Sequence, residues 1–302
     1  MKIAVIGAGA MGCLYACMLS EKNQVTLYDI SRDTVDAINS NGIVMRSPDG
    51  SESVFKVPAR SDDGGETAEL VILFVKDTAS RAALKGYRRL ISDSSLLLSL
   101  QNGMGNEEIM EEFADRSNIF LGTTKHNCVS LAPGVIYHSG SGITHIGSPS
   151  GSKGASVIGD CFRSSGIETE ECEDVKRLLW EKLFVNMTIN PITAVLGTKI
   201  SLIAESDPAK QLARALIDEA VAVAERDGEV FDADEVFGGL ISTARALSSG
   251  TASMCQDIEH GRRTEIDFIN GAVVRLGEKY GVPAPTHKAI CLMVKAKESL
   301  SR

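Results

Sequence analysis

The sequence predicts an α/β protein in which a parallel β-sheet domain is followed by an all-helical domain. Short apolar segments alternate with segments of helical periodicity over residues 1–173, which is typical of βαβ units. The first apolar segment runs directly into a glycine-rich turn, and helical periodicity dominates from residue 174 onward. A chain of 302 residues with 43% hydrophobic content can form two cores. We therefore expect one domain over residues 1–173 and a second over residues 174–302.

The expected elements of the first domain follow in order along the chain. Strands are expected at 2–6, 24–28, 70–75, 95–100 and 119–121, with helices at 11–21, 33–40, from about 78, and at 106–114. Two further strands, 134–138 and 143–146, are separated by Ser-Gly-Ser-Gly, which predicts an antiparallel hairpin. A helix at 155–164 and a strand at 168–172 complete this half.

The second domain is expected to contain helices separated by short breaks. Asp207-Pro208 predicts a helix start with proline in the first turn, and that helix runs to residue 226. Ser253 to Gln256 fits a capping box, and Glu265 falls in the first turn of a helix expected from residue 264. Further helices are expected at 234–247 and from residue 284. Asn270-Gly271 would lie inside the helix from 264, where a glycine suggests close approach of backbone or ligand.

Composition excludes several classes of function. The net charge of −9 and pI of about 5.2 argue against a nucleic-acid or anionic-membrane surface. No apolar run is long enough for a transmembrane helix. The seven cysteines are odd in number and form no CxxC pair, so neither a disulfide framework nor a metal site is expected. These features predict a cytoplasmic protein without nucleic-acid or membrane partners.

The glycine-rich turn fits a dinucleotide-binding fingerprint. Gly7-Ala8-Gly9-Ala10-Met11-Gly12 matches GxGxxG between a strand and a helix, and Asp29 closes the second strand. Gly7 permits the tight turn, Gly9 lets the backbone approach a pyrophosphate, and Gly12 allows close helix–strand contact. The helix N-terminus favours phosphate binding. The alternative is a glycine-rich turn that serves packing alone.

Polar residues recur on one face of the first helix of the second domain. Lys182, Asn186 and Asn190 are spaced i, i+4 and i+8, so they form one stripe among large apolar residues. Such a stripe could line a cavity for a polar, anionic molecule; the alternative is a solvated helix face. Pro191 is expected to kink or end this helix just after Asn190. Asn102 follows a strand, where ligands bind in such sheets, although a plain Asn-Gly turn explains it equally well.

Six collinear segments resemble the ketopantoate reductase (2-dehydropantoate 2-reductase) family. They are KIAVIGAGAMG at the start, FVKDT at 74–78, LQNGMGNEE at 100–108, PGVIYHSGSGITHIG at 133–147, WEKLFVNMTINPITA at 180–194 and SMCQDIEHGRRTEIDFINGAVV at 253–274. The resemblance implies a Rossmann domain and a helical domain with an active site in the cleft between them. It also implies NADPH-dependent reduction of 2-dehydropantoate to (R)-pantoate, on the pathway to pantothenate and coenzyme A.

The same resemblance implies roles for individual residues. Lys182 would be the general acid that protonates the C2 oxygen, and Glu265 would orient this lysine and contact substrate and cofactor. Substrate-binding roles would fall to Asn186, Asn190 and Ser253. Asn102 would hold both substrate and nicotinamide, and Lys76 would lie near the cofactor. A cationic donor at this oxygen would stabilise the negative charge that develops during hydride transfer.

The sequence departs from the family pattern at two places. Many members have an aromatic residue and a glutamine after the lysine of the VK segment, where this chain has Asp77-Thr78. Many also have an arginine at the end of the second strand, where Asp29 stands here. Arg32, three residues on, could instead pair with a 2′-phosphate. The resemblance therefore implies NADP(H), whereas Asp29 makes NAD(H) possible.

Two other functions remain open from the sequence. One is a reductase of the same fold that acts on another small 2-oxo acid. The other is a dinucleotide-binding regulator without turnover, which the presence of both Lys182 and Glu265 disfavours. In each case the expected partner is a small molecule, and the chain is expected to be a monomer or homodimer.

Overall fold

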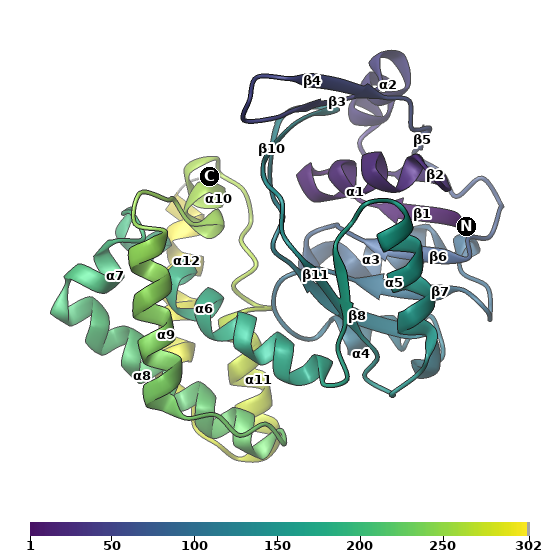
Figure 1. Cartoon of the computed structure of the whole chain (residues 1–302). Helices are drawn as coiled ribbons and strands as arrows, with labels where there is room; N and C mark the ends of the chain where they lie inside the picture. Colours follow the sequence, from purple (N-terminus) through teal and green to yellow (C-terminus); the bar gives the residue numbers. More distant parts are fainter. Residues whose placement is uncertain (301–302) are drawn as a thin grey trace. The chain divides into compact units, whose positions relative to one another are not determined.

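The computed structural model describes residues 1–300, which form two compact units (Figure 1). The first unit consists of Met1–Gln101 and Asn106–Leu178. The second consists of Asn102–Gly105 and the chain from Leu179 onward. The short segment 102–105 thus belongs to the helical unit, although the residues on both sides of it belong to the sheet-containing unit.

An eight-stranded sheet forms the centre of the first unit, in the order β12-β11-β8-β7-β6-β1-β2-β5. Neighbouring strands are parallel, except that β8 and β11 are antiparallel. The strands are β1 (Lys2–Ile6), β2 (Gln24–Tyr28), β5 (Ala59–Arg60), β6 (Leu70–Leu73), β7 (Leu96–Ser99), β8 (Ile119–Thr124), β11 (Thr144–Gly147) and β12 (Thr169–Glu171). The predicted parallel α/β class is confirmed.

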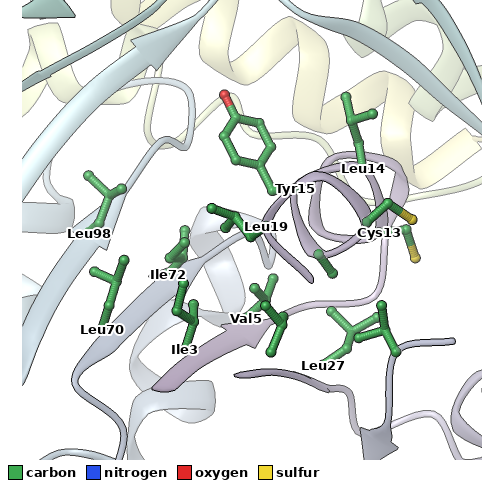
Figure 2. Close-up of a cluster of buried hydrophobic side chains, with 14 of the residues drawn as sticks. Ile3, Val5, Cys13, Leu14, Tyr15, Leu19, Leu27, Leu70, Ile72 and Leu98 are labelled. Carbon is green, nitrogen blue, oxygen red and sulfur yellow. The ribbon is translucent and has the colours of Figure 1, made fainter. Parts of the chain in front are cut away.

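The strand order reverses at β1, which pairs with β2 on one side and β6 on the other. The helices of this unit are α1 (Ala10–Ser20), α2 (Arg32–Asn41), α3 (Ser80–Gly86), α4 (Asn106–Met110) and α5 (Gly154–Ser164). Figure 2 shows the packing of α1 on the sheet, with Leu19 beside Val5 and Ile72 in a core from which water is excluded. Ligands of such sheets bind at the carboxyl ends of the strands beside this reversal.

A second, four-stranded sheet has the order β4-β3-β10-β9. Its strands are β3 (Ile43–Arg46), β4 (Glu52–Phe55), β9 (Asn127–Ala132) and β10 (Val135–Gly140). The predicted hairpin of 134–138 with 143–146 is wrong, because β10 pairs with β9 whereas β11 lies in the larger sheet. Most residues of β4 and β9 are exposed, so the sequence carries little hydrophobic alternation there to reveal them.

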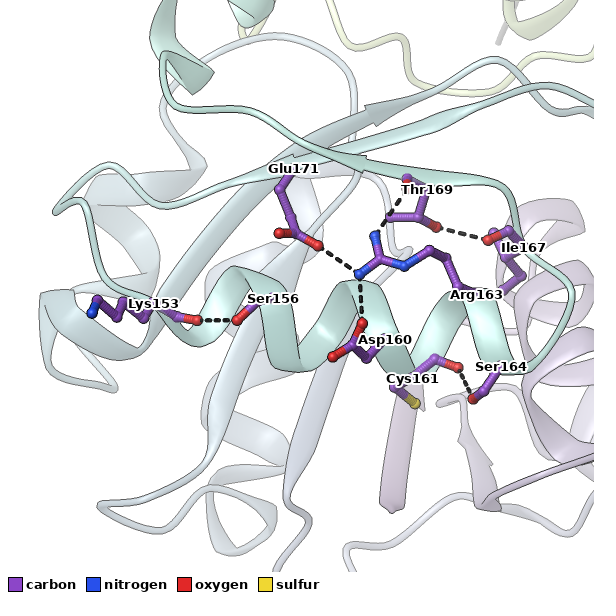
Figure 3. A network of polar contacts seen from close by, with 9 residues as sticks. All are labelled: Lys153, Ser156, Asp160, Cys161, Arg163, Ser164, Ile167, Thr169 and Glu171. Atoms are coloured by element: carbon purple, nitrogen blue, oxygen red, sulfur yellow. Dashed lines mark hydrogen bonds and ion pairs between the residues drawn. The ribbon is translucent and has the colours of Figure 1, made fainter.

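A polar network fastens α5 to the edge strand β12 (Figure 3). Arg163 donates hydrogen bonds to Glu171 (2.7 Å) and to the backbone carbonyl of Thr169 (3.1 Å), both on β12. It also pairs with Asp160 on its own helix at 2.6 Å. One guanidinium thus joins the last helix of the first unit to its outermost strand.

The second unit is helical around its own core. Its helices are α6 (Val175–Leu196, which begins in the first unit), α7 (Leu202–Glu205), α8 (Asp207–Arg226), α9 (Ala233–Ala246), α10 (Ser253–Glu259), α11 (Asn270–Tyr280) and α12 (Pro285–Leu300). The predicted start of α8 at Asp207-Pro208 is confirmed, and Ser206 caps it by accepting from the Ala209 amide. Trp180 of α6 is fully buried in the core and donates through Nε1 to Asp227 at 3.0 Å.

Two local predictions in this unit are wrong. The helix expected from residue 264 begins at Asn270, because Thr264 is instead held by Glu298 and turns occupy the residues between. Ser253 does not cap α10; the N-cap is Ala252, and the Gln256 side chain bonds to the carbonyl of residue 251. Of the two outcomes expected at Pro191, a kink or the end of the helix, the second does not occur, because α6 continues to residue 196.

Candidate active site

The glycine-rich turn after β1 is as tightly packed as the fingerprint predicts. Gly7 has a φ of +109°, and a Cβ there would lie 2.7 Å from the backbone of Phe74. A Cβ on Gly12 would lie 1.8 Å from the carbonyl oxygen of Gly7. A Cβ on Gly9, by contrast, would meet nothing within 4 Å. Gly7 and Gly12 are therefore required by the close packing of the turn, whereas Gly9 leaves open space over the backbone.

That open space lies at the N-terminus of α1. Gly9 is the N-cap and no side chain bonds to the first turn, so the helix dipole and amides there are available to an anion. The turn itself is braced: the amide of Ala8 donates to Asp29 at 2.7 Å, and its carbonyl accepts from the Cys13 thiol at 3.4 Å. Burial raises the pKa of Cys13 to about 12, so this thiol stays protonated at neutral pH. Together these contacts fix the backbone of the turn beside the uncapped N-terminus of α1, and we call this turn the Gly9 cradle.

Asp29 lies at the end of β2 with both carboxylate oxygens engaged. One oxygen accepts from the Ala8 amide, and the other accepts from the Ser31 amide at 2.9 Å. Arg32 is exposed in the first turn of α2. Lys76 is half-buried in the segment after β6, next to the residues that contact Gly7. Asp29 and Lys76 therefore lie in the segments that follow β2 and β6, the two strands that flank β1.

The polar stripe of α6 is not a solvated helix face. Lys182 and Asn186 are half-buried, and Asn190 is only 7% exposed. Burying a lysine stem and two amides beside apolar side chains is unfavourable unless polar partners are present. The three residues are therefore partly enclosed by the protein, and Asn190 is the most enclosed of them.

Backbone hydrogen bonds bring the segments of Asn102 and Glu265 together. The amide of Met104 donates to the Phe268 carbonyl at 2.9 Å, and the Phe268 amide donates to the Glu265 carbonyl at 3.0 Å. A Cβ on Gly103, where φ is +83°, would lie 2.3 Å from the Phe268 oxygen, so only glycine permits this approach. Segment 102–105 thus rests on the turn that begins at Glu265.

The same turn is joined to α6. Asn270, at its end, donates through Nδ2 to the carbonyl of Met187, which lies between Asn186 and Asn190. Asn102, Glu265 and the α6 stripe are therefore carried by three connected segments of one unit. Ser253 is exposed at the start of α10. The sequence pattern placed Asn270 inside a helix and did not reveal this link.

The described residues contain no membrane-length apolar helix, and no group of three or more His, Cys, Asp or Glu side chains among them is placed to hold a metal ion. The cysteines are all free thiols.

Comparison with known proteins covers both halves of the chain. The family model described as Ketopantoate reductase PanE/ApbA matches residues 3–151, and the model of its C-terminal domain matches residues 174–298. A 2-dehydropantoate 2-reductase of Pyrococcus abyssi is 34% identical, with 99% of each chain covered. One from Halobacterium salinarum is 31% identical, with 98% of each covered.

Solved structures agree over the whole length. A ternary structure of D-mandelate dehydrogenase with NADH and anilino(oxo)acetate has a TM-score of 0.93 and 30% identity, covering 100% of this chain and 99% of that one. A 2-dehydropantoate 2-reductase from Geobacter metallireducens has a TM-score of 0.89 and 27% identity, covering 98% and 99%. The fingerprint, the α6 stripe and these matches agree, and the chain belongs to the ketopantoate reductase family.

Proposed function

We propose that this protein catalyses the NAD(P)H-dependent reduction of 2-dehydropantoate to (R)-pantoate, a step toward pantothenate and coenzyme A. The observation that carries the proposal is the half-buried stripe of Lys182, Asn186 and Asn190, held in one unit with the segments of Asn102 and Glu265. The full-length similarity to 2-dehydropantoate 2-reductases supports the substrate. The free cysteines fit a cytoplasmic location.

The cradle at Gly9 fits a nicotinamide dinucleotide, because the open space over its backbone would admit a pyrophosphate at the α1 N-terminus. Bound NAD(P)H would supply the hydride. Lys76 would lie along the cofactor, and the fixed amides of the turn would neutralise phosphate charge.

In the second unit, Lys182 would donate a proton to the C2 oxygen of the substrate as that oxygen gains negative charge. Glu265 would orient the lysine and contact both substrate and cofactor. Asn186, Asn190 and Ser253 would bind the substrate, and Asn102 would bind both molecules. We expect Glu265 and Ser253 to face Lys182, and a separation beyond about 10 Å in a substrate complex would exclude the direct contact that hydrogen bonding requires.

The choice of dinucleotide depends on Asp29. A carboxylate at this position accepts hydrogen bonds from the adenosine ribose and repels a 2′-phosphate, whereas Arg32 could attract one. We expect relaxed preference, with kcat/KM for NADH within about tenfold of that for NADPH, or about 1.4 kcal/mol. The structure of a related D-mandelate dehydrogenase holds NADH.

Asp29→Asn tests this expectation. The variant removes the negative charge but keeps one oxygen that can accept from the Ala8 amide, so the turn should stay folded. Asp29→Ala also removes the charge but loses that bond, so it is the less selective change. The expected result is a shift of kcat/KM toward NADPH in steady-state assays with both cofactors. A wild-type preference for NADPH of about a thousandfold or more would mean that Arg32 or another cation overrides Asp29.

A second candidate is reduction of a 2-oxo acid with a different side chain. It is favoured by the TM-score of 0.93 to a D-mandelate dehydrogenase bound to anilino(oxo)acetate. In this case the Lys182 and Asn186 side chains would bind the shared 2-oxo acid group, and the apolar neighbours would select the side chain.

A turnover assay separates these candidates. We expect 2-dehydropantoate to have the highest kcat/KM among 2-oxo acids that include phenylglyoxylate and 2-oxoisovalerate. Preference for an aromatic 2-oxo acid would establish the second candidate. Dinucleotide binding without turnover of any member would indicate the regulator instead.

A further inference from the structure

Helix α6 contains one backbone position that cannot donate a hydrogen bond. Pro191 has no N–H, so the Met187 carbonyl four residues earlier lacks the partner that a regular helix provides. The side-chain Nδ2 of Asn270 lies 2.8 Å from this carbonyl and donates to it. Asn270 is fully buried, at 0% exposure. A side-chain amide from another segment thus takes the place of the missing backbone amide.

The orientation of the Asn270 amide follows from its other neighbour. Its Nδ2 also lies 3.1 Å from Nδ1 of His287, whose Nε2 is 2.8 Å from the Leu216 carbonyl. A carbonyl only accepts, so Nε2 carries the proton and Nδ1 is left as an acceptor. Burial lowers the pKa of His287, which keeps the ring neutral at neutral pH. Both hydrogens of Asn270 Nδ2 therefore point to acceptors. If the side-chain amide were flipped, its oxygen would face the same two acceptors, and neither hydrogen bond could form.

The other atom of the Asn270 amide is unsatisfied. Its Oδ1 is buried and has no hydrogen-bond partner within the described part of the chain. An unpaired buried acceptor lowers the stability of the folded protein, so stability alone does not explain an asparagine at this position. What the residue contributes is its pair of donors, one of which reaches α6.

The bond connects two parts of the proposed site. On α6, the Met187 carbonyl lies between Asn186 and Asn190 of the stripe. Asn270 itself directly follows the turn in which the Phe268 and Ile269 amides both donate to the Glu265 carbonyl. Two side-chain hydroxyls, of Thr188 and Thr193, bond to other α6 carbonyls, but they lie on α6 itself and these bonds do not leave the helix.

We propose that Asn270 is a positioning residue: by replacing the N–H that Pro191 lacks, it fixes the α6 stripe relative to the turn of Glu265. The inference rests on the proposed function, in which Lys182 and Asn190 on one segment and Glu265 on the other act on one substrate. Asn270 itself need not touch substrate. A small displacement of positioned groups can cost about a hundredfold in rate, so a lost link should affect turnover strongly.

The test is a double-mutant cycle of Asn270→Ala and Pro191→Ala, measured by both kinetics and thermal unfolding. Asn270→Ala should lower kcat by about 10- to 100-fold and Tm by about 2–4 °C. The KM for the dinucleotide should change less than kcat, because the glycine turn, Asp29 and Lys76 belong to the first unit. In the double variant, the alanine that replaces Pro191 supplies an N–H that can bond to the Met187 carbonyl. The cost of Asn270→Ala in Tm should therefore be smaller in the Pro191→Ala background than in the wild type, whereas kcat should stay low, because this N–H does not restore the link between α6 and the turn of Glu265.

A matched control separates positioning from stability. Val273→Ala removes a fully buried side chain one turn further along α11, so it should lower Tm without affecting the Met187 carbonyl or kcat. If Asn270→Ala lowers Tm but leaves kcat at the level of this control, the residue is merely structural and the inference is wrong. An equal cost of Asn270→Ala in Tm with and without Pro191, or recovery of kcat in the double variant, would also overturn it.

The failure of the proposed function has a different signature. A wild-type protein that turns over no 2-oxo acid would refute the function, and with it the positioning role. The unfolding arm of the same cycle would still decide whether Asn270 replaces the missing N–H, because it requires no substrate. If the two substitutions are coupled in Tm but the wild-type protein turns over no 2-oxo acid, the proposed function is therefore the part that fails.

Discussion

Lys182→Ala should lower kcat by about 10²–10⁴-fold, the usual contribution of a positioned general acid. The loss arises because no cation would then protonate and stabilise the oxygen at C2 as the hydride arrives. Dinucleotide affinity should stay nearly unchanged, since the glycine turn, Asp29 and Lys76 lie in the first unit. Stopped-flow or steady-state assays for kcat, together with titration of the dinucleotide, provide both readouts.

Lys288→Ala is the matched control, because this lysine is exposed on α12 of the same unit. It removes one positive charge without touching the α6 stripe and should leave kcat unchanged. Near-normal kcat in Lys182→Ala would remove this residue from the mechanism. Equal losses in both variants would point to a general effect of net charge.

Gly9→Ala should weaken dinucleotide binding without unfolding the protein, whereas Gly12→Ala should destabilise the fold. A Cβ on Gly9 meets no atom within 4 Å, so the protein should fold with a stability change of at most about 1 kcal/mol. The same methyl group would occupy the space through which a pyrophosphate approaches. Dinucleotide affinity should therefore fall about 10- to 100-fold, equivalent to roughly 1–3 kcal/mol of overpacking.

Gly12→Ala should instead destabilise the folded protein, because its Cβ would lie 1.8 Å from the Gly7 carbonyl oxygen. The expected cost is about 1–3 kcal/mol or more, read as a lower denaturation midpoint without cofactor. Gly86→Ala, at the open end of α3, is the control that should change neither property. Full dinucleotide affinity in Gly9→Ala would show that the phosphates do not approach at this turn.

The sequence was most informative where local chemistry and tertiary packing agree. The Gly7–Gly12 turn and the start of α8 at Asp207-Pro208 could be located because their backbone requirements are local. The α6 stripe could be recognised from spacing, since residues four apart share a helix face. The residues proposed to act there remain a prediction that substrate complexes and kinetics must test.

Other features depend on contacts distant in sequence. The hairpin prediction failed because β10 pairs with β9 and with β3 across the second sheet, which no local turn signal reveals. The helix predicted from residue 264 failed because Glu298, 34 residues away, accepts the Thr264 amide and hydroxyl that would have begun it. The link from Asn270 to α6 had one signal in the sequence: Pro191 must leave the Met187 carbonyl without a helical partner.

The most direct measurement follows the hydride itself. Wild-type protein would be given 2-dehydropantoate and NAD(P)H deuterated at C4 of the nicotinamide, in each of the two configurations, and the product analysed by NMR and chiral chromatography. One of the two labelled cofactors should place deuterium at C2 of pantoate, and the product should be the R enantiomer alone. Formation of unlabelled pantoate from both, or no pantoate while another 2-oxo acid is reduced, would contradict the assignment of this protein as a 2-dehydropantoate reductase.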